Sequence, residues 1–242
     1  MTAIQARRST RPPRRNRLGA EGLKDRAGRA VALIVDASDL EGLAIALYER
    51  LGHDPSRPVS TFRLARDLLG ADALIRPPSI VGSPASTFTL GGARRIALKR
   101  TVPLRYARFF VGHELGHALL EEEGYAYDDL EVCCDYLGAA LMAPRPAMRA
   151  MQGIFGFAFD ELAEVVGATQ TWAALRCAEV LRMPLAVIAP TVRVRGPEEW
   201  VWPDEQTLRE WARSRRAPRG LARLRLTDDP HRVVLRPEDA DP

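Results

Sequence analysis

The sequence predicts an α+β fold with a mainly helical core, a small and mostly antiparallel sheet, and a small α/β extension at the C-terminal end. Apolar residues recur at helical spacing in several segments between residues 38 and 181. Two alternating segments flank Gly91-Gly92, a pair that favours a tight β-hairpin turn. Strand-like segments return after residue 185. With 242 residues and 46% hydrophobic composition, the chain can bury a substantial core.

Charge and cysteine usage narrow the class of protein. The formal charge is +4, and Lys24 and Lys99 are the only lysines, so arginine supplies nearly all the positive charge. We interpret this as composition bias and only weakly as a sign of a nucleic-acid partner. Cys133, Cys134 and Cys177 form no C-x-x-C pair, which disfavours a cysteine zinc site and fits a reducing compartment. No secretory or membrane-spanning segment is evident, so we expect a soluble cytoplasmic protein without a membrane partner.

The N-terminal part predicts a tail followed by two helices. Residues 1–28 carry clustered arginines among Ser, Pro, Asn and Gly with little to bury, which predicts a disordered basic arm. That arm is either a solvated tail or a contact for nucleic acid or an acidic partner. A capping box of Ser38 and Glu41 begins a helix that Gly52 ends. A second helix is expected over residues 60–69.

The middle of the chain predicts strands and then two long helices. A short strand is expected over residues 73–76, and a hairpin joins residues 86–90 to residues 94–99. Pro103 suits the first turn of the helix that follows. The next helix begins near residues 128–129 and runs to Ala143.

The remainder predicts further helices and a small extension. We expect a helix over residues 145–152, a helix–turn–helix over residues 160–181, and then the C-terminal elements. The helix–turn–helix resembles a DNA-binding motif. Its second helix, however, carries only Arg176 and Arg182 together with the acidic Glu179, which is little positive charge for binding phosphates. Two packed helices are the preferred interpretation. The C-terminal strands are expected at residues 185–188, 192–194, 223–226 and 233–235, with a helix over residues 204–213.

The motif His113-Glu114-x-x-His117 carries the chemistry. On a helix, His113 and His117 lie one turn apart on one face, so both imidazoles can bind one metal ion. Glu114 lies beside them and can act on a water molecule without binding the metal. Zinc with two histidine ligands needs a third protein ligand and keeps one position open. Residues 118–123 supply no third histidine, so a metzincin is disfavoured.

Two acids on the following helix are candidates for completing the site. Glu131 and Asp135 are one turn apart in a segment rich in alanine, leucine and cysteine, where unpaired acids are uncommon. We predict Glu131 as the third metal ligand, the alternative being that both acids face solvent. Asp135 is expected either to orient His113 or His117, or to cap a local group.

The motif resembles the ImmA/IrrE family of metallo-endopeptidases. That resemblance rests on His-Glu-Leu-Gly-His at residues 113–117, Glu131-x-x-x-Asp135, and the run Ala-Ala-Leu-Met-Ala-Pro at residues 139–144. It extends over roughly residues 38–190. The resemblance implies a zincin-like metalloprotease core in which Glu131 is the third zinc ligand. The predicted division is a disordered basic arm at 1–28, an ImmA/IrrE-like domain at 29–184 and an extension of unknown role at 185–242.

The expected activity is zinc-dependent peptide hydrolysis. Zn²⁺ held by His113, His117 and Glu131 activates water, and Glu114 is the general base. Tyr125, Tyr127 and Tyr136 are the nearest candidates for a second electrophile. The segment 94–99 is expected to be a sheet edge onto which the substrate adds as a strand.

The resemblance also implies a substrate. Family members typically relieve repression by cleaving a helix-turn-helix repressor, so a repressor is the expected protein partner. Two alternatives remain open. One is a DNA-binding regulator with a structural or vestigial zinc site, and the other is a module that only docks another protein.

Overall fold

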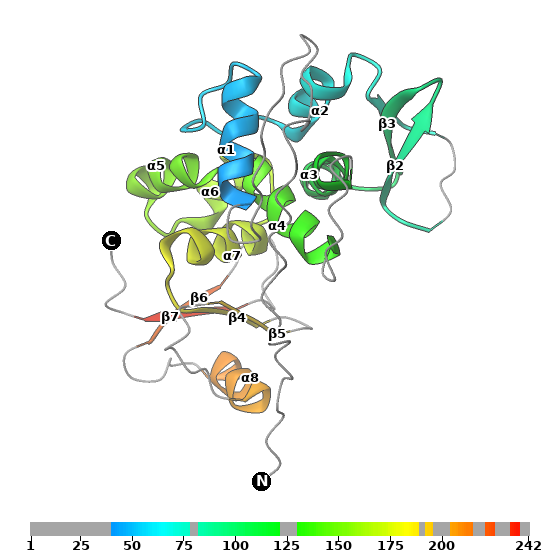
Figure 1. Cartoon of the computed structure of the whole chain (residues 1–242). Coiled ribbons are helices and arrows are strands. Elements are labelled where there is room, and N and C mark those ends of the chain that lie inside the picture. Colours follow the sequence, from blue (N-terminus) through cyan, green and yellow to red (C-terminus); the bar gives the residue numbers. More distant parts are fainter. Residues whose placement is uncertain are drawn as a thin grey trace, which may run out of the picture.

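The computed structural model describes residues 40–77, 82–121, 130–188, 192–195, 204–214, 221–225 and 233–237. The predicted basic arm, Ser38, Tyr125 and Tyr127 lie outside these residues. The α+β prediction is confirmed: a helical body lies between a small sheet at one side and a second sheet at the other (Figure 1).

The element bounds follow the predicted segments closely. The helical body contains α1 (Leu40–Arg50), α2 (Thr61–Leu69), α3 (Leu104–Glu121), α4 (Leu130–Met142), α5 (Arg145–Phe155), α6 (Phe159–Val166) and α7 (Gln170–Leu181). The first sheet contains β1 (Leu74–Ile75), β2 (Ala85–Leu90) and β3 (Ala93–Leu98). The C-terminal part contains β4 (Leu185–Ile188), β5 (Val192–Arg195), α8 (Glu205–Arg213), β6 (Leu221–Arg225) and β7 (Val233–Pro237). Across the described segments, no helix has the length and apolar character needed to span a bilayer.

The first sheet has the strand order β1-β3-β2. Strands β2 and β3 pair antiparallel with the register Leu90↔Ala93, and the Gly91 and Gly92 φ angles are 60° and 76°. Both glycines are therefore left-handed, as the predicted two-residue hairpin turn requires. Strand β1 pairs with the other side of β3, parallel to it. The prediction that residues 94–99 form a sheet edge is wrong, because β3 is the central strand and β2 lies at the end.

Helices α3 and α4 form the centre of the first core. Their buried side chains, such as Leu115 of α3 and Leu137 of α4, share one core with residues of α1, with Leu64 of α2 and with Ile96 of β3. The hydroxyl of Tyr48 on α1 donates a hydrogen bond to the Leu141 carbonyl at 2.8 Å, which ties α1 to the end of α4. The core thus holds α3 and α4 from several sides.

A buried ion pair joins α1 to α7. The Arg176 guanidinium donates to the Glu41 carboxylate at 2.6 Å and to the Ala143 carbonyl at 3.1 Å. Arg176 and Glu41 are only 1% and 4% exposed. Glu41 also accepts a hydrogen bond from the Arg145 backbone amide. Glu41, which was predicted as a helix-capping residue, therefore makes a tertiary contact. The ion pair compensates two charges, each of which would be costly to bury alone.

The second sheet has the order β5-β4-β7-β6, and all its neighbouring strands are antiparallel. Leu185, Val187 and Val234 pack into the core formed with α5, α6 and α7. On the opposite face, Ile188 and Leu235 pack with Leu208 of α8. The predicted C-terminal extension thus packs directly on the helical body, with α8 on the outer face of its sheet (Figure 1).

Helix α7 is embedded in this core. None of residues 170–181 is in the exposed class, and Ala173, Ala174 and Cys177 are fully buried. The turn before it is tight, with Gly167 left-handed and the Thr169 hydroxyl capping α7 at the Trp172 amide. A recognition helix needs a free face for the major groove. The packed-helices interpretation therefore describes α6 and α7 better than a DNA reader does.

Candidate metal centre

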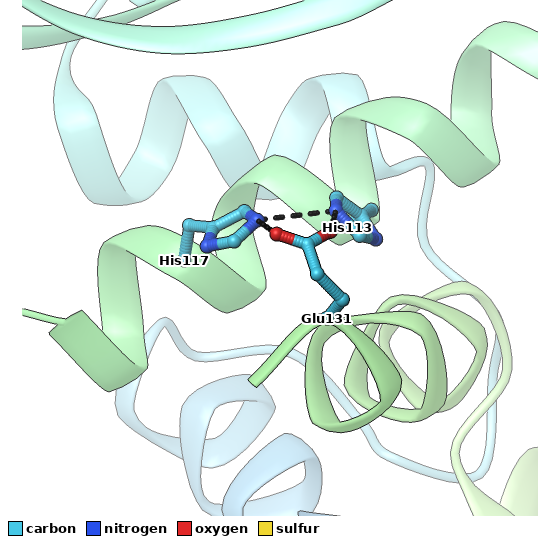
Figure 2. A group of neighbouring side chains, drawn as sticks. All are labelled: His113, His117 and Glu131. Carbon is cyan, nitrogen blue, oxygen red and sulfur yellow. Dashed lines mark hydrogen bonds and ion pairs between the residues drawn. The ribbon is translucent and has the colours of Figure 1, made fainter. Parts of the chain in front are cut away.

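Three predicted ligand residues lie together where α3 meets α4. His113 and His117 are one turn apart on α3, and their Nε2 atoms are 3.1 Å from each other. Glu131, in the first turn of α4, places one carboxylate oxygen 3.2 Å from His113 Nε2 and the other 3.4 Å from His117 Nε2 (Figure 2). The donor atoms all lie within 4.8 Å of one another.

These distances fit a tetrahedral metal ion. With metal–ligand bonds of about 2.0–2.1 Å, neighbouring ligand atoms in a tetrahedral site are about 3.3–3.4 Å apart. Two imidazoles and one carboxylate are a donor set typical of catalytic zinc, with a fourth position left for water. The histidine side chains are about one-seventh exposed, at 15% and 13%, and Glu131 is 76% exposed. The open position would therefore face solvent and an incoming substrate.

Glycine residues allow α3 and α4 to approach so closely. A Cβ atom added to Gly138 would lie 2.8 Å from the His113 backbone nitrogen, and one on Gly112 would lie 2.8 Å from the Gly138 carbonyl oxygen. A Cβ on Gly116 would lie 3.1 Å from Cys134 Cα. Side chains at these positions would separate the helices that carry the three ligands. The spacing Gly112-x-x-x-Gly116 is the sequence signal from which this close contact could have been predicted.

Asp135 holds one of the histidines. Its carboxylate is 2.8 Å from His113 Nδ1, so of the alternatives left open by the sequence, the structure favours the contact with His113. This hydrogen bond raises the pKa of His113, against the opposing effect of partial burial. With Nδ1–H donated to Asp135, the Nε2 lone pair faces the cluster.

Glu114 points toward the first sheet. It is only 8% exposed, and its Oε2 atom accepts a hydrogen bond of 2.7 Å from the Thr87 hydroxyl on β2. Thr87 was not found by sequence reasoning, because a threonine inside a hairpin strand carries no local signal of a contact with Glu114. The carboxylate is therefore fixed between α3 and the end strand of the sheet.

One predicted residue lies elsewhere. Tyr136 was a candidate electrophile, but its hydroxyl lies 3.4 Å from Glu41 Oε2 and its ring beneath Arg176, so it belongs to the buried α1–α7 contact. A second Asp–His pair lies away from the cluster, where His53 Nε2 is 2.8 Å from Asp67 Oδ2. The other two tyrosine candidates lie outside the described residues.

Comparison with known proteins agrees with this geometry. Residues 71–178 match the model of the IrrE N-terminal-like domain, Peptidase_M78. The matched segment contains α3 and α4 and thus all residues of the site. Over these residues the chain is similar to a metallopeptidase-like domain, and the match confirms the predicted resemblance to the ImmA/IrrE family.

A solved structure supports the fold over a longer stretch. A Mycobacterium tuberculosis transcriptional regulator matches with a TM-score of 0.53 and 13% identity, covering 84% of this chain and 88% of that chain. At this identity the match shows a shared fold. A search among curated proteins gave no match.

Proposed function

We propose that this chain is a zinc-dependent cytoplasmic endopeptidase that cleaves a helix-turn-helix transcriptional repressor and so relieves repression. The observation that carries the proposal is the triangle of His113, His117 and Glu131 at tetrahedral spacing, with a buried glutamate beside it. The class of substrate is inferred from the resemblance to the ImmA/IrrE family. An exposed carboxylate ligand and a solvent-facing fourth position suit a protein substrate.

Each residue has a definable role. His113, His117 and Glu131 would hold the zinc ion, and Asp135 would fix the ring of His113. Bound zinc supplies a Lewis acid that polarises the scissile carbonyl and lowers the pKa of a coordinated water molecule. Glu114 takes the proton from the attacking water and passes it to the leaving amine.

Strand β2 supports a revised route for the substrate. It lies at the end of the described sheet, and its Thr87 contacts Glu114. An extended peptide that pairs with the outer side of β2 would run past the general base. Main-chain hydrogen bonds at a sheet edge are a common way to bind peptides. We therefore propose β2, in place of β3, as the strand that receives the substrate.

Zinc content is the first experimental test. The wild-type protein should hold about one zinc ion per chain, and Glu131→Ala should lower its zinc affinity sharply because one of three ligands is lost. Glu161→Ala is the matched control, since Glu161 is also an exposed acid in the first turn of a helix. A folded wild-type protein that binds no zinc would refute the metallopeptidase proposal.

Cleavage is the second test. The protein is expressed together with candidate helix-turn-helix repressors from the same genome, and repressor fragments are followed by mass spectrometry. Glu114→Gln should keep zinc and abolish cleavage, because the amide cannot accept the proton. Repressor cleavage that persists in Glu114→Gln would contradict the assigned role.

A further inference from the structure

The buried carboxylate of Glu114 receives a hydrogen bond from a separate element. Thr87 on β2 lies 27 residues earlier in the chain, and its Oγ1 atom is 2.7 Å from Glu114 Oε2. The Thr87 Oγ1 atom is also 3.2 Å from the backbone carbonyl oxygen of Glu114. Thr87 thus contacts both the side-chain carboxylate and the backbone carbonyl of Glu114.

We propose that Thr87 is a positioning residue that fixes the Glu114 carboxylate for proton transfer. The proposal rests on the proposed peptidase function. A glutamate side chain has three rotatable bonds, and a proton acceptor must be held within a few tenths of an ångström to be effective. Because the Thr87 hydroxyl occupies Oε2, the carboxylate is held at one oxygen and Oε1 is left to take the proton from water.

The position of Thr87 makes it suitable for this role. Its χ1 angle is restricted because threonine is branched at Cβ. Its backbone is fixed by pairing with Ile96 on the central strand of the sheet. A rigid donor on a rigid strand holds Glu114 more firmly than a water molecule or a loop would.

The hydroxyl can serve Glu114 throughout the reaction. A threonine hydroxyl offers one donor and two acceptor positions. It donates to Oε2 while Glu114 is ionised, and it can still donate to Oε2 when Oε1 carries the proton. No heavy atom has to move between the two states, so the buried acid keeps its hydrogen bond in both.

The test compares three variants of the full-length, zinc-loaded protein. Thr87→Val removes the hydroxyl and keeps the shape, whereas Thr87→Ser restores the hydroxyl. Thr61→Val is the matched control, because Thr61 is a buried threonine that donates at 2.7 Å to a backbone carbonyl of the same helix, that of Arg108. A purely structural role for Thr87 would make Thr87→Val resemble Thr61→Val.

The first readout needs no substrate. The protein is labelled with ¹³C at the glutamate carboxyl carbon, and the Glu114 signal is assigned from its disappearance in Glu114→Gln. At one fixed pH, this signal should shift in Thr87→Val and stay near its wild-type position in Thr87→Ser and Thr61→Val. An unshifted signal in Thr87→Val would overturn the proposal.

The second readout is the rate of repressor cleavage. Thr87→Val should lower kcat by about tenfold to a hundredfold with little change in KM or zinc affinity, since misplacement of a catalytic group affects mainly the chemical step. Thr87→Ser should recover most of the rate, and Thr61→Val should lose stability but keep kcat. Wild-type kcat in Thr87→Val would overturn the proposal. If the zinc-loaded wild type cleaves nothing, the proposed function fails, and the carboxyl signal alone decides whether Thr87 holds Glu114.

Discussion

Substituting Gly138 with alanine should separate the two helices that hold the metal ligands. The new Cβ atom would lie 2.8 Å from the His113 backbone nitrogen, against the 3.4 Å at which ordinary contacts begin. Helices α3 and α4 must therefore move apart locally by about 0.6 Å, because the contacted atoms are backbone and cannot rotate away. Metal–ligand bonds tolerate deviations of only about 0.2 Å.

The expected effect is a loss of both stability and zinc binding. Overpacking of this kind costs about 1–3 kcal/mol in free energy of unfolding. We expect the zinc affinity to fall by about tenfold or more, comparable with the loss of a group that supports a ligand. Chelator competition measures the affinity, and urea unfolding of the metal-free protein measures the stability.

Gly153→Ala is the control for replacing a helical glycine by alanine where no close contact is present. Gly153 lies within α5, and a Cβ atom there meets nothing within 4 Å. Alanine at an exposed helical position should raise the free energy of unfolding by about 0.5–1 kcal/mol and leave zinc binding unchanged. If Gly138→Ala behaves like Gly153→Ala in both assays, the close contact between α3 and α4 does not build the site.

Three further outcomes are expected. Asp135→Asn should lower zinc affinity by about 10- to 100-fold in chelator competition, while Asp67→Asn, at a second Asp–His pair, should not change it. Arg176→Met should cost about 3–5 kcal/mol in urea unfolding, because it leaves Glu41 buried without a cation; a cost below about 1 kcal/mol would contradict this. Burial raises the pKa of the Cys177 thiol from 9.0 to about 12. Its protonated form is favoured by folding, so this contribution is complete below pH 9 and falls by up to about 1.4 kcal/mol per pH unit as pH rises toward 12. Cys177→Ala should flatten that decline, and equal slopes would contradict the assignment.

Local signals in the sequence predicted most of the elements. The Gly91-Gly92 turn, α2 and the α6–α7 pair lie where periodicity and turn residues place them, because each depends on neighbours in the chain. The predicted end of α5 at Gly153 was too early. Gly153 is tolerated inside the helix, and Gly156, with a φ angle of 58°, ends it.

The edge of the first sheet was mispredicted for a different reason. Strand β1 is two residues long and pairs in parallel with residues 96–97, about twenty positions later. Such a short strand has no periodicity, and parallel pairing requires a long connection that leaves no local pattern.

For the site, the residues brought together along one helix were the easiest to predict. His113, Glu114 and His117 follow from helical geometry alone, and Glu131 was supported by the family resemblance. The roles proposed for Thr87 and Gly138 rest on contacts between elements, because they depend on how strand β2 and helix α4 pack against α3. Tyr136 is near the predicted ligands in sequence, but its ring lies against Arg176 of α7.

The buried pair of Glu41 and Arg176 has a consequence for protein synthesis. These partners are 135 residues apart, and the three proposed metal ligands lie between them in the chain. When synthesis has reached Glu131, the Glu41 carboxylate on α1 still lacks its partner Arg176. Helix α1 must nevertheless pack onto the core that holds α3 and α4. We therefore expect the metal site to become firm only after Arg176 has been synthesised and has paired with Glu41. A fragment limited to residues 71–178 would keep Arg176, lose Glu41, and fold poorly despite containing all the ligands.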